Sequence, residues 1–279
     1  MMAFKVFLGV GHGGSDPGAV SGSFVEANIN LVMALAAKKE LERHGVIVGI
    51  SRTKDENDPL YQEIKECNAF APDLAIDCHN NAGSPTADGF EAYVQTGTHA
   101  TQSKKLASAI EKRVKAIGQN SRGLKIKKNT AGTDWFGWLR ECKCPAVLVE
   151  GFFVDGVKDR LDFDTKAEQE KMGVAYAHGI LDYLGIAVKK AETSTNTSTS
   201  TNSGVLYRVQ VGAFSVKANA NALMKDLKSK GFTAFIRTST SNGKTLYHVQ
   251  VGAYSVKANA ENMAKQLKSK GYAAIIKQQ

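Results

Sequence analysis

Residues 4–18 read FKVFLGVGHGGSDPG, and this stretch sets the fold of the first part of the chain. The apolar run, broken only by Lys5, has the length of a buried strand, and it passes directly into a glycine-rich loop. A segment with helical spacing follows, so the chain starts as strand, turn and helix. The same alternation continues through residues 1–190, which predicts an α/β domain with a mostly parallel sheet and helices on both faces.

The expected elements decide where functional residues should be sought. Strands are predicted at residues 4–11, 46–52, 74–79, 90–95 and 146–150. Helices are predicted at residues 27–44, 59–70, 99–117 and 166–184. Sites in such sheets lie at the carboxyl ends of the strands, so residues that end a predicted strand are the first candidates for function.

The bulk properties are those of an ordinary soluble protein, with 43% apolar and 23% charged residues. No apolar run approaches the roughly 20 residues that a membrane-spanning helix needs, so no membrane partner is expected. The N-terminal segment lacks a small-residue cleavage site and reads as a strand rather than a secretion signal. We therefore expect synthesis in the cytoplasm without a signal peptide.

A polar run divides the chain. Residues 191–204 read AETSTNTSTSTNSG and contain no large apolar side chain, so they cannot bury enough surface to offset chain entropy. This run predicts a flexible linker at residues 189–204. It separates one domain over residues 1–188 from a second over residues 205–279.

The second domain contains an internal repeat. Residues 207–232 match residues 247–272 almost position by position. Each copy begins with strand-like alternation and continues as a helix, with Ser215 in the position of an N-cap. The apolar face of the first helix is expected to contain Ala218, Ala222, Leu223 and Leu227. A short strand at 232–236 follows, so two copies predict a ferredoxin-like βαββαβ domain with its sheet covered on one side.

Positive charge is concentrated in this second domain. The net charge of the chain is +9, and residues 204–279 contain ten Lys, two Arg, one Asp and one Glu, a net charge of +10. The remainder therefore carries 9 − 10 = −1. This asymmetry indicates that the second domain meets an anionic or polyhydroxylated partner.

Four residues of the first domain are candidates for chemistry. His12 and His79 end predicted strands, Glu150 ends the strand AVLVE, and Glu26 opens the first helix. Two histidines and one glutamate form a donor set that suits a catalytic zinc with an open position for water. Glu150 would then act as the general base and later as the acid for a leaving amine.

Each of these residues also has a structural interpretation. The loop around His12 could be a plain turn or a phosphate-binding loop, and Glu26 could only favour the helix dipole. Glu150 is harder to explain in this way, because a Glu within an apolar strand should be buried, and an unpaired buried carboxylate is costly. The four residues together favour a site.

The neighbours of His79 narrow the chemistry. Cys78 cannot use His79 as its base, because adjacent residues on a strand point to opposite faces. The same period places Asp77, His79 and Asn81 on one side, where they provide a ligand with polar support. Asn81 is therefore a candidate for substrate contact.

These motifs resemble those of the zinc-dependent N-acetylmuramoyl-L-alanine amidases over about residues 3–185: GHGG-x-DPGA, a Glu fourteen residues after the histidine, H-x-N, and V-E-x-F-F. The resemblance implies zinc ligands at His12, Glu26 and His79 and a catalytic glutamate at Glu150. It also implies cleavage of the amide between the lactyl group of N-acetylmuramic acid and L-alanine. Asp-Cys before His79 departs from the small or apolar pair of many relatives.

The repeat resembles the SPOR domain. The pattern Y-x-V-Q-V-G-A-F/Y-S occurs at residues 207–215 and 247–255. The resemblance implies binding of glycan strands without stem peptides on the open face of the sheet. The polar residues that alternation places on this face are Arg208, Gln210, His248 and Gln250.

The first domain without a secretion signal is similar to phage endolysins and mother-cell lysis amidases, autolysins that wait inside the cell until the membrane fails. We therefore expect action on the cell wall after release, as part of cell lysis.

Three other functions compete with this one. A βαββαβ domain of charge +10 could bind RNA, but its open face would carry Gln, Arg and His rather than stacking aromatic residues, so no nucleic-acid partner is expected. The same metal donors could serve a peptidase that cuts within the stem peptide. A purely structural wall-binding protein is disfavoured by Glu150 and the three donors. The sequence sets no oligomeric state.

Overall fold

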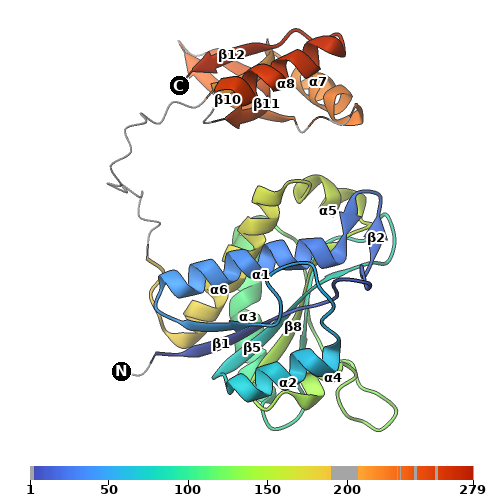
Figure 1. The fold of residues 1–279 in the computed structure, drawn as a ribbon, viewed down its shortest axis with the longest axis vertical. Helices are drawn as coiled ribbons and strands as arrows, with labels where there is room; N and C mark the ends of the chain where they lie inside the picture. Colours follow the sequence, from blue (N-terminus) through green and yellow to red (C-terminus); the bar gives the residue numbers. More distant parts are fainter. Residues whose placement is uncertain are drawn as a thin grey trace. The chain divides into compact units, whose positions relative to one another are not determined.

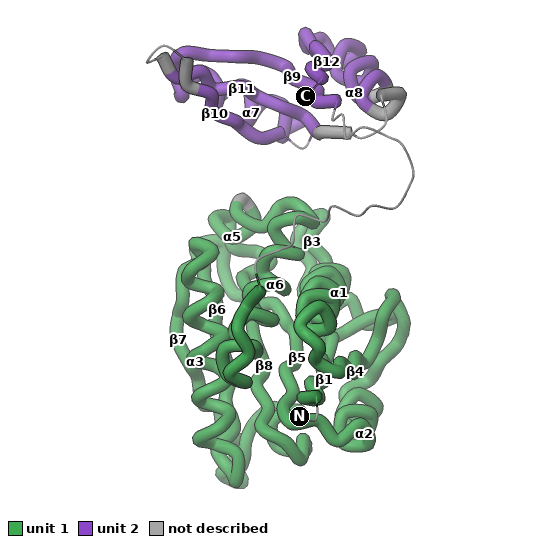
Figure 2. The backbone as a smooth tube through the Cα atoms, turned by 90° about the vertical axis from the view of Figure 1, so that its left-hand side faces the viewer, with its two compact units in different colours: residues 1–193 green, residues 194–279 purple. Residues whose placement is uncertain are grey.

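The computed structural model describes residues 3–189, 207–230, 232, 234–241, 244–254 and 257–278. The chain divides into two compact units, residues 1–193 and 194–279 (Figure 2). The predicted linker at 189–204 lies outside the described residues except for residue 189.

Unit 1 is built around a six-stranded sheet with the order β4-β1-β5-β8-β6-β7. Its strands are β1 (Lys5–Val10), β4 (Ile47–Ile50), β5 (Leu74–Asn81), β6 (Phe90–Val94), β7 (Ser121–Lys125) and β8 (Ala146–Phe153). The first four strands in the order are parallel, β6 runs antiparallel to β8, and β7 runs parallel to β6. A hairpin of β2 (Val20–Ser21) and β3 (Phe24–Val25) lies outside this sheet.

Helices cover both faces of the sheet (Figure 1). They are α1 (Glu26–Arg43), α2 (Leu60–Phe70), α3 (Ala100–Ala116), α4 (Gly137–Glu141), α5 (Val157–Asp162) and α6 (Lys166–Leu184). The larger core lies under α1, α3 and α6, where Met33, Ile110 and Tyr176 are fully buried. A smaller core lies under α2 and α4 and includes Phe7 and Trp138. The α/β prediction is confirmed.

Several elements of unit 1 were not predicted. The β2–β3 hairpin, α4 and α5 have two to six residues each, too few to show a period. β7 has the polar sequence SRGLK and is only partly buried, so it lacks an apolar pattern. β5 and β8 also extend past their predicted ends, to Asn81 and Phe153, so His79 and Glu150 lie within strands rather than at their last residues.

Unit 2 has the predicted βαββαβ order. Its elements are β9 (Tyr207–Phe214), α7 (Lys217–Ser229), β10 (Phe235–Ser241), β11 (Lys244–Tyr254), α8 (Lys257–Ser269) and β12 (Ile275–Gln278). The antiparallel sheet has the order β10-β11-β9-β12. Val209 and Val249 pack against both helices through Ala220, Leu227 and Leu267.

Three details of the first repeat differ from the prediction. Ser215 is not the N-cap, because α7 starts after Val216 and has no side-chain cap. Ala218 and Ala222 are exposed. The helix instead buries Ala220 and Leu227 and packs Leu223 and Met224 against the core, because packing against the sheet decides which face is buried. The following strand begins at Phe235 rather than at residue 232.

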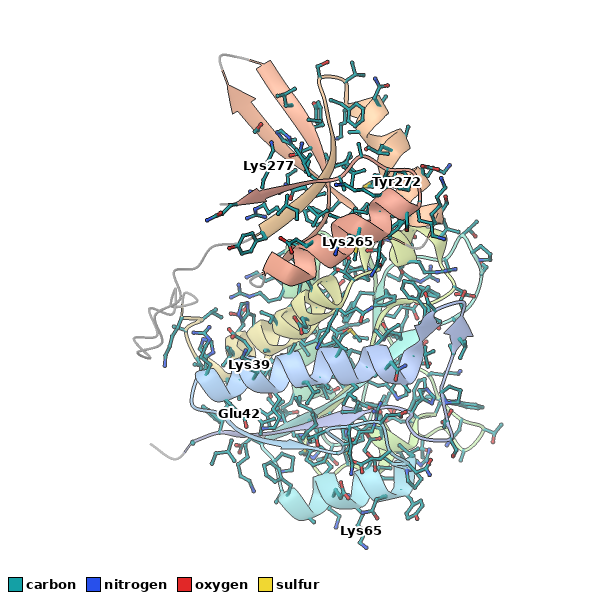
Figure 3. The ribbon with its side chains drawn as sticks, turned by 45° about the horizontal axis from the view of Figure 1, so that its top comes forward. Lys39, Glu42, Lys65, Lys265, Tyr272 and Lys277 are labelled. Atoms are coloured by element: carbon teal, nitrogen blue, oxygen red, sulfur yellow. The ribbon has the colours of Figure 1, made fainter. Side chains whose placement is uncertain are left out.

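The helices carry charged side chains outward. Lys65 on α2, Lys265 on α8 and Lys277 on β12 are exposed (Figure 3). Lysines of unit 2 thus occupy both its helices and its sheet, and its charge is spread over both sides of the unit. Within the described part of the chain, no helix is long and apolar enough to cross a membrane.

Candidate active site

The loop after β1 holds His12 in an unusual backbone conformation. His12 has a φ of 66°, a left-handed value that non-glycine residues rarely adopt. The buried Arg52 fixes this loop, because its Nε donates to the carbonyl of Val10 at 3.0 Å and its Nη2 to that of Ala27 at 2.7 Å. The guanidinium therefore joins the end of β1 to the start of α1, the two segments that carry His12 and Glu26.

His12, Glu26 and His79 meet at this edge of the sheet. Glu26 Oε1 lies 3.3 Å from His12 Nε2 and 3.0 Å from His79 Nδ1. One donor atom of each residue lies within 4.8 Å of the others. Among the described residues, this is the only group of three or more such side chains close enough to hold one ion.

Backbone donors hold Glu26 in place. Ala19 N donates to Oε2 at 2.9 Å, and Asn80 N donates to Oε1 at 3.1 Å. Burial raises the pKa of Glu26, but the hydrogen bonds from His12 and His79 outweigh it and keep the pKa of this carboxyl well below its usual range. Glu26 is therefore a fixed anion between two imidazoles.

The donor set fits a zinc ion. Two His nitrogens and one Glu oxygen are common ligands at catalytic zinc sites, and bonds of about 2.0–2.1 Å in a tetrahedron place the ligand atoms about 3.3 Å apart. The observed distances of 3.0 and 3.3 Å from Glu26 are close to this spacing. A Cβ at Gly18 would lie 2.6 Å from Glu26 Oε2, so a glycine is needed beside the donors.

Glu150 lies beside this cluster. It is the register partner of His79 on the parallel strand β5 and of Glu91 on the antiparallel strand β6. Its Oε2 is shielded from solvent and has no hydrogen-bond partner. Burial raises the pKa of Glu150 to about 8. Glu150 thus places a carboxyl group next to the metal-type donors (His12, Glu26 and His79), and its Oε2 makes no hydrogen bond to them.

A cleft of about 510 Å³ opens onto these residues. Its walls combine carboxyl groups with apolar side chains, and neither Lys nor Arg lines it; the lining includes His12, Asp16, Asp58, Leu60, Glu63, Asp77, His79, Phe136, Trp138, Leu148 and Glu150. Ten buried side-chain N or O atoms lack a hydrogen bond among the described residues, and five of them belong to Asp58, Asp77, Trp138 and Glu150. Unsatisfied polar atoms are therefore concentrated where a polar ligand would bind.

Asn81 does not line this cleft. Its Nδ2 donates to Glu91 Oε2 at 3.2 Å, and the register of β5 shifts between His79 and Asn81. Glu91 also accepts from Arg122 Nε at 2.5 Å. Asn81 therefore belongs to a polar group on the β6 side, next to Glu150.

The structure places the four polar residues of unit 2 on the sheet face opposite the helices. Gln210 and Gln250 are register partners, and they are only 6% and 5% exposed. Their cross-strand neighbours Ile275 and Phe235 explain this shielding, because register partners share a face.

Among the described residues of this face, three buried polar atoms have no hydrogen bond: Arg208 Nε, His248 Nδ1 and Gln250 Oε1. The other ring nitrogen of His248 lies 2.7 Å from Ser239 Oγ. Phe235, which is 38% exposed, adds an aromatic ring to a face that strand alternation predicts to be polar.

Sequence reasoning missed the residues that support the metal-type donors. Asn80 Nδ2 donates to Asn30 Oδ1 at 2.7 Å, and Asn30 Nδ2 donates to the carbonyl of Gly11 at 3.0 Å. Arg52 was also missed. These residues could have been found as polar residues at core positions of a helix or strand. Buried polar groups need hydrogen-bond partners, so such positions point to a structural role.

Unit 1 is an α/β domain whose mostly parallel sheet brings two histidines and two glutamates together beside one cleft, as in a metal-dependent hydrolase. The chain belongs to the N-acetylmuramoyl-L-alanine amidase family, which matches residues 6–182. Residues 203–278 match the SPOR domain family. Both resemblances drawn from the sequence motifs are confirmed.

Relatives share most of the chain. It is 34% identical over 234 residues to a sporulation-specific N-acetylmuramoyl-L-alanine amidase of Bacillus subtilis, covering 83% of this chain and 84% of the relative. It is 30% identical over 209 residues to an endolysin of Bacillus phage SPP1, covering 73% and 74%. The structure of the catalytic domain of CwlV, an amidase of Bacillus (Paenibacillus) polymyxa var. colistinus, superposes with a TM-score of 0.59 at 26% identity, covering 67% of this chain and all of that one.

Proposed function

We propose that unit 1 is a zinc-dependent N-acetylmuramoyl-L-alanine amidase that cleaves the amide between the lactyl group of N-acetylmuramic acid and L-alanine in peptidoglycan. The observation that carries the proposal is the shielded, unpartnered Oε2 of Glu150 beside the cluster of His12, Glu26 and His79, in one cleft. A fixed anion between two imidazoles is a set of metal ligands, and a free carboxyl next to it is a group for proton transfer.

In this proposal His12 Nε2, Glu26 Oε1 and His79 Nδ1 hold the metal. Zinc, when bound, supplies a Lewis acid that polarises the amide carbonyl and lowers the pKa of water. Glu150 takes the proton from the attacking water and later delivers it to the nitrogen of the leaving L-alanine. The apolar side chains Leu60 and Phe136 line the cleft and limit the water around these groups.

Unit 2 is proposed to hold the glycan strand on its open sheet face. Arg208, Gln210, His248 and Gln250 supply donors and acceptors for sugar hydroxyls, and three of these residues have polar atoms without a hydrogen bond. Phe235 offers a ring for stacking against a sugar. The arrangement would be a catalytic domain at 1–188, a linker at 189–204 and a wall-binding domain at 205–279.

Cell lysis is the proposed role of this activity. The relative named as an endolysin supports it. We propose that the protein is made in the cytoplasm and reaches the wall after release. Expression in a bacterial host should leave the cells intact until the membrane is permeabilised, and lysis before permeabilisation would contradict this route.

The activity is tested by incubating the full chain with purified sacculi, with and without a zinc chelator, and identifying new chain ends by mass spectrometry. Free L-alanine amino termini with intact glycan are expected, lost on chelation and restored by zinc. New termini inside the stem peptide would assign a peptidase instead. Release that a chelator does not affect would overturn the zinc proposal, and no release would leave only a wall-binding protein.

A further inference from the structure

Both histidines of the candidate metal site have a carboxylate at their second ring nitrogen. His12 Nδ1 lies 2.8 Å from Asp16 Oδ2, and His79 Nε2 lies 3.3 Å from Asp77 Oδ2. The first nitrogen of each ring faces Glu26 Oε1. Each imidazole is therefore placed between a shared carboxylate on one side and its own carboxylate on the other.

The surroundings of Asp77 leave the ring of His79 as its available partner. Asp77 is 1% exposed, and neither of its oxygens has a hydrogen bond, so the approach of His79 Nε2 to Oδ2 at 3.3 Å is its ionic contact. A carboxylate buried without partners is costly, so a residue of this kind needs a compensating interaction. The ring of His79 is the donor that the fold places within reach.

The strands are built to accommodate this pair. Asp77 and His79 are two residues apart on β5 and so point to the same face. On the neighbouring strand, Gly9 is the register partner of Asp77. A Cβ at Gly9 would lie 2.8 Å from Asp77 Oδ1, and a Cβ at Gly11 would lie 2.1 Å from His79 Nε2. Two glycines with the same spacing thus leave room for the carboxylate and for the imidazole.

The pair matters because a neutral imidazole has one N–H and one free lone pair. His79 can offer Nδ1 to a metal only when its proton is on Nε2, and an acceptor at Nε2 favours that tautomer. We propose that Asp77 is a positioning residue that fixes His79 as the Nε2–H tautomer and orients Nδ1 toward the metal. This inference rests on the proposed zinc site and adds to it a positioning residue beyond the three metal ligands.

The first test measures zinc binding on the full chain by competition with a chromophoric chelator, with folding checked by circular dichroism. Asp77→Ala should weaken zinc affinity by about 10–100-fold, the usual effect of losing an outer partner of a metal-bound histidine. Asp77→Asn should lose less, because its amide oxygen can still accept from Nε2–H.

Glu63→Gln is the matched control. Glu63 is also buried in this cleft and its oxygen is also 2.8 Å from a Cβ placed at Gly9, but it accepts from Val10 N at 2.7 Å and Ser51 Oγ at 3.1 Å rather than from His79. An equal loss of zinc affinity in Glu63→Gln and Asp77→Ala would reveal a general effect of changing a buried carboxyl group in this cleft and overturn the positioning role.

The second test needs no variant. Long-range proton–nitrogen NMR spectra of the zinc-loaded wild-type chain report which ring nitrogen of His79 carries the proton. A proton on Nε2 supports the proposal, whereas a proton on Nδ1 overturns it even if the Asp77 variants fail to fold. A wild-type chain that binds no zinc would instead overturn the proposed zinc site, so the two failures are distinguishable.

Discussion

At the level of single residues, Glu150 allows zinc binding to be tested separately from catalysis. Its carboxyl is next to the metal-type donors but makes no hydrogen bond through Oε2. We expect Glu150→Gln to keep zinc, because His12, Glu26 and His79 are unchanged. Turnover of a soluble muropeptide should fall by about 10²–10⁴-fold, the usual contribution of a general acid–base group.

Metal content and kcat measured on the same sample check this prediction. Glu141→Gln is the control, because Glu141 is on the surface with its side chain 53% exposed. Near-normal kcat in Glu150→Gln would remove Glu150 from the mechanism.

Gly11 tests the steric basis of the site. A Cβ at this position would lie 2.1 Å from His79 Nε2, so Gly11→Ala must displace the imidazole. We expect the variant to lose stoichiometric zinc, measured by elemental analysis after dialysis. Gly97→Ala is the matched control, because a Cβ at Gly97 has no atom within 4 Å. Full zinc occupancy in Gly11→Ala would show that the site tolerates a shifted His79.

The site residues differ in how far the sequence could reveal them. His12, His79 and Glu150 could be predicted because parallel strands bring their carboxyl ends to one edge of a sheet. Asn30, Arg52 and the contact of Asp77 with His79 could not, because their roles depend on which loop or ring lies opposite. Such contacts depend on register and side-chain direction, which single-sequence patterns do not determine.

At the scale of secondary structure, one ion pair joins the two helices behind the main core. Arg113 on α3 donates through Nε and Nη2 to both oxygens of Asp182 on α6, each at 2.6 Å. The hydrogen bond from Arg113 holds the pKa of Asp182 below its usual value. Both side chains are about one-third exposed, at 34% and 29%, so the contribution is modest.

Asp182→Asn should therefore lower the free energy of unfolding by about 0.5–1 kcal/mol at neutral pH. Because the pKa of Asp182 is lower in the folded state, the carboxylate stabilises the fold above the unfolded pKa of about 3.9. This stabilisation is lost as the pH falls through the folded pKa. Urea denaturation of wild type and variant over a pH series should show the difference shrinking below about pH 4, and a constant difference would contradict it.

The elements that the sequence predicted well are those with a long periodic pattern. α1, α3 and α6 have 17 to 19 residues and start within one residue of the expected positions. α4 has five residues and β7 is polar, so neither has a pattern to detect. The same limit explains Ser215, because a serine beside a helix start satisfies the capping pattern whether or not it caps.

For the whole molecule, the division into two domains was the property easiest to predict from the sequence. The polar run at 191–204 and the repeat beyond it needed only composition and period. The boundary between the two compact units falls between residues 193 and 194 of the sequence, inside that run. The sequence could not show that Gln210 and Gln250 would be shielded on the open face, because their neighbours Ile275 and Phe235 come from other strands.

Catalysis and wall binding should be separable, because each unit has its own core. Unit 1 has its own core beneath α1, α3 and α6, and unit 2 has another around Val209 and Val249. A chain that ends at residue 189 should therefore fold and cleave soluble muropeptides with unchanged kcat. Its binding to sacculi, measured by co-sedimentation, should weaken because the proposed sugar-binding face is gone.

Arg208→Ala in the full chain refines this prediction. Arg208 has a buried Nε without a hydrogen bond on the open face, so its loss should weaken sedimentation with sacculi. Lys265→Ala is the control. Lys265 is on α8, on the opposite side of the sheet, and its substitution removes the same unit of positive charge. An equal loss in both variants would assign wall binding to net charge rather than to the sheet face. Loss of muropeptide cleavage in the truncated chain would instead show that unit 1 depends on unit 2 for its activity.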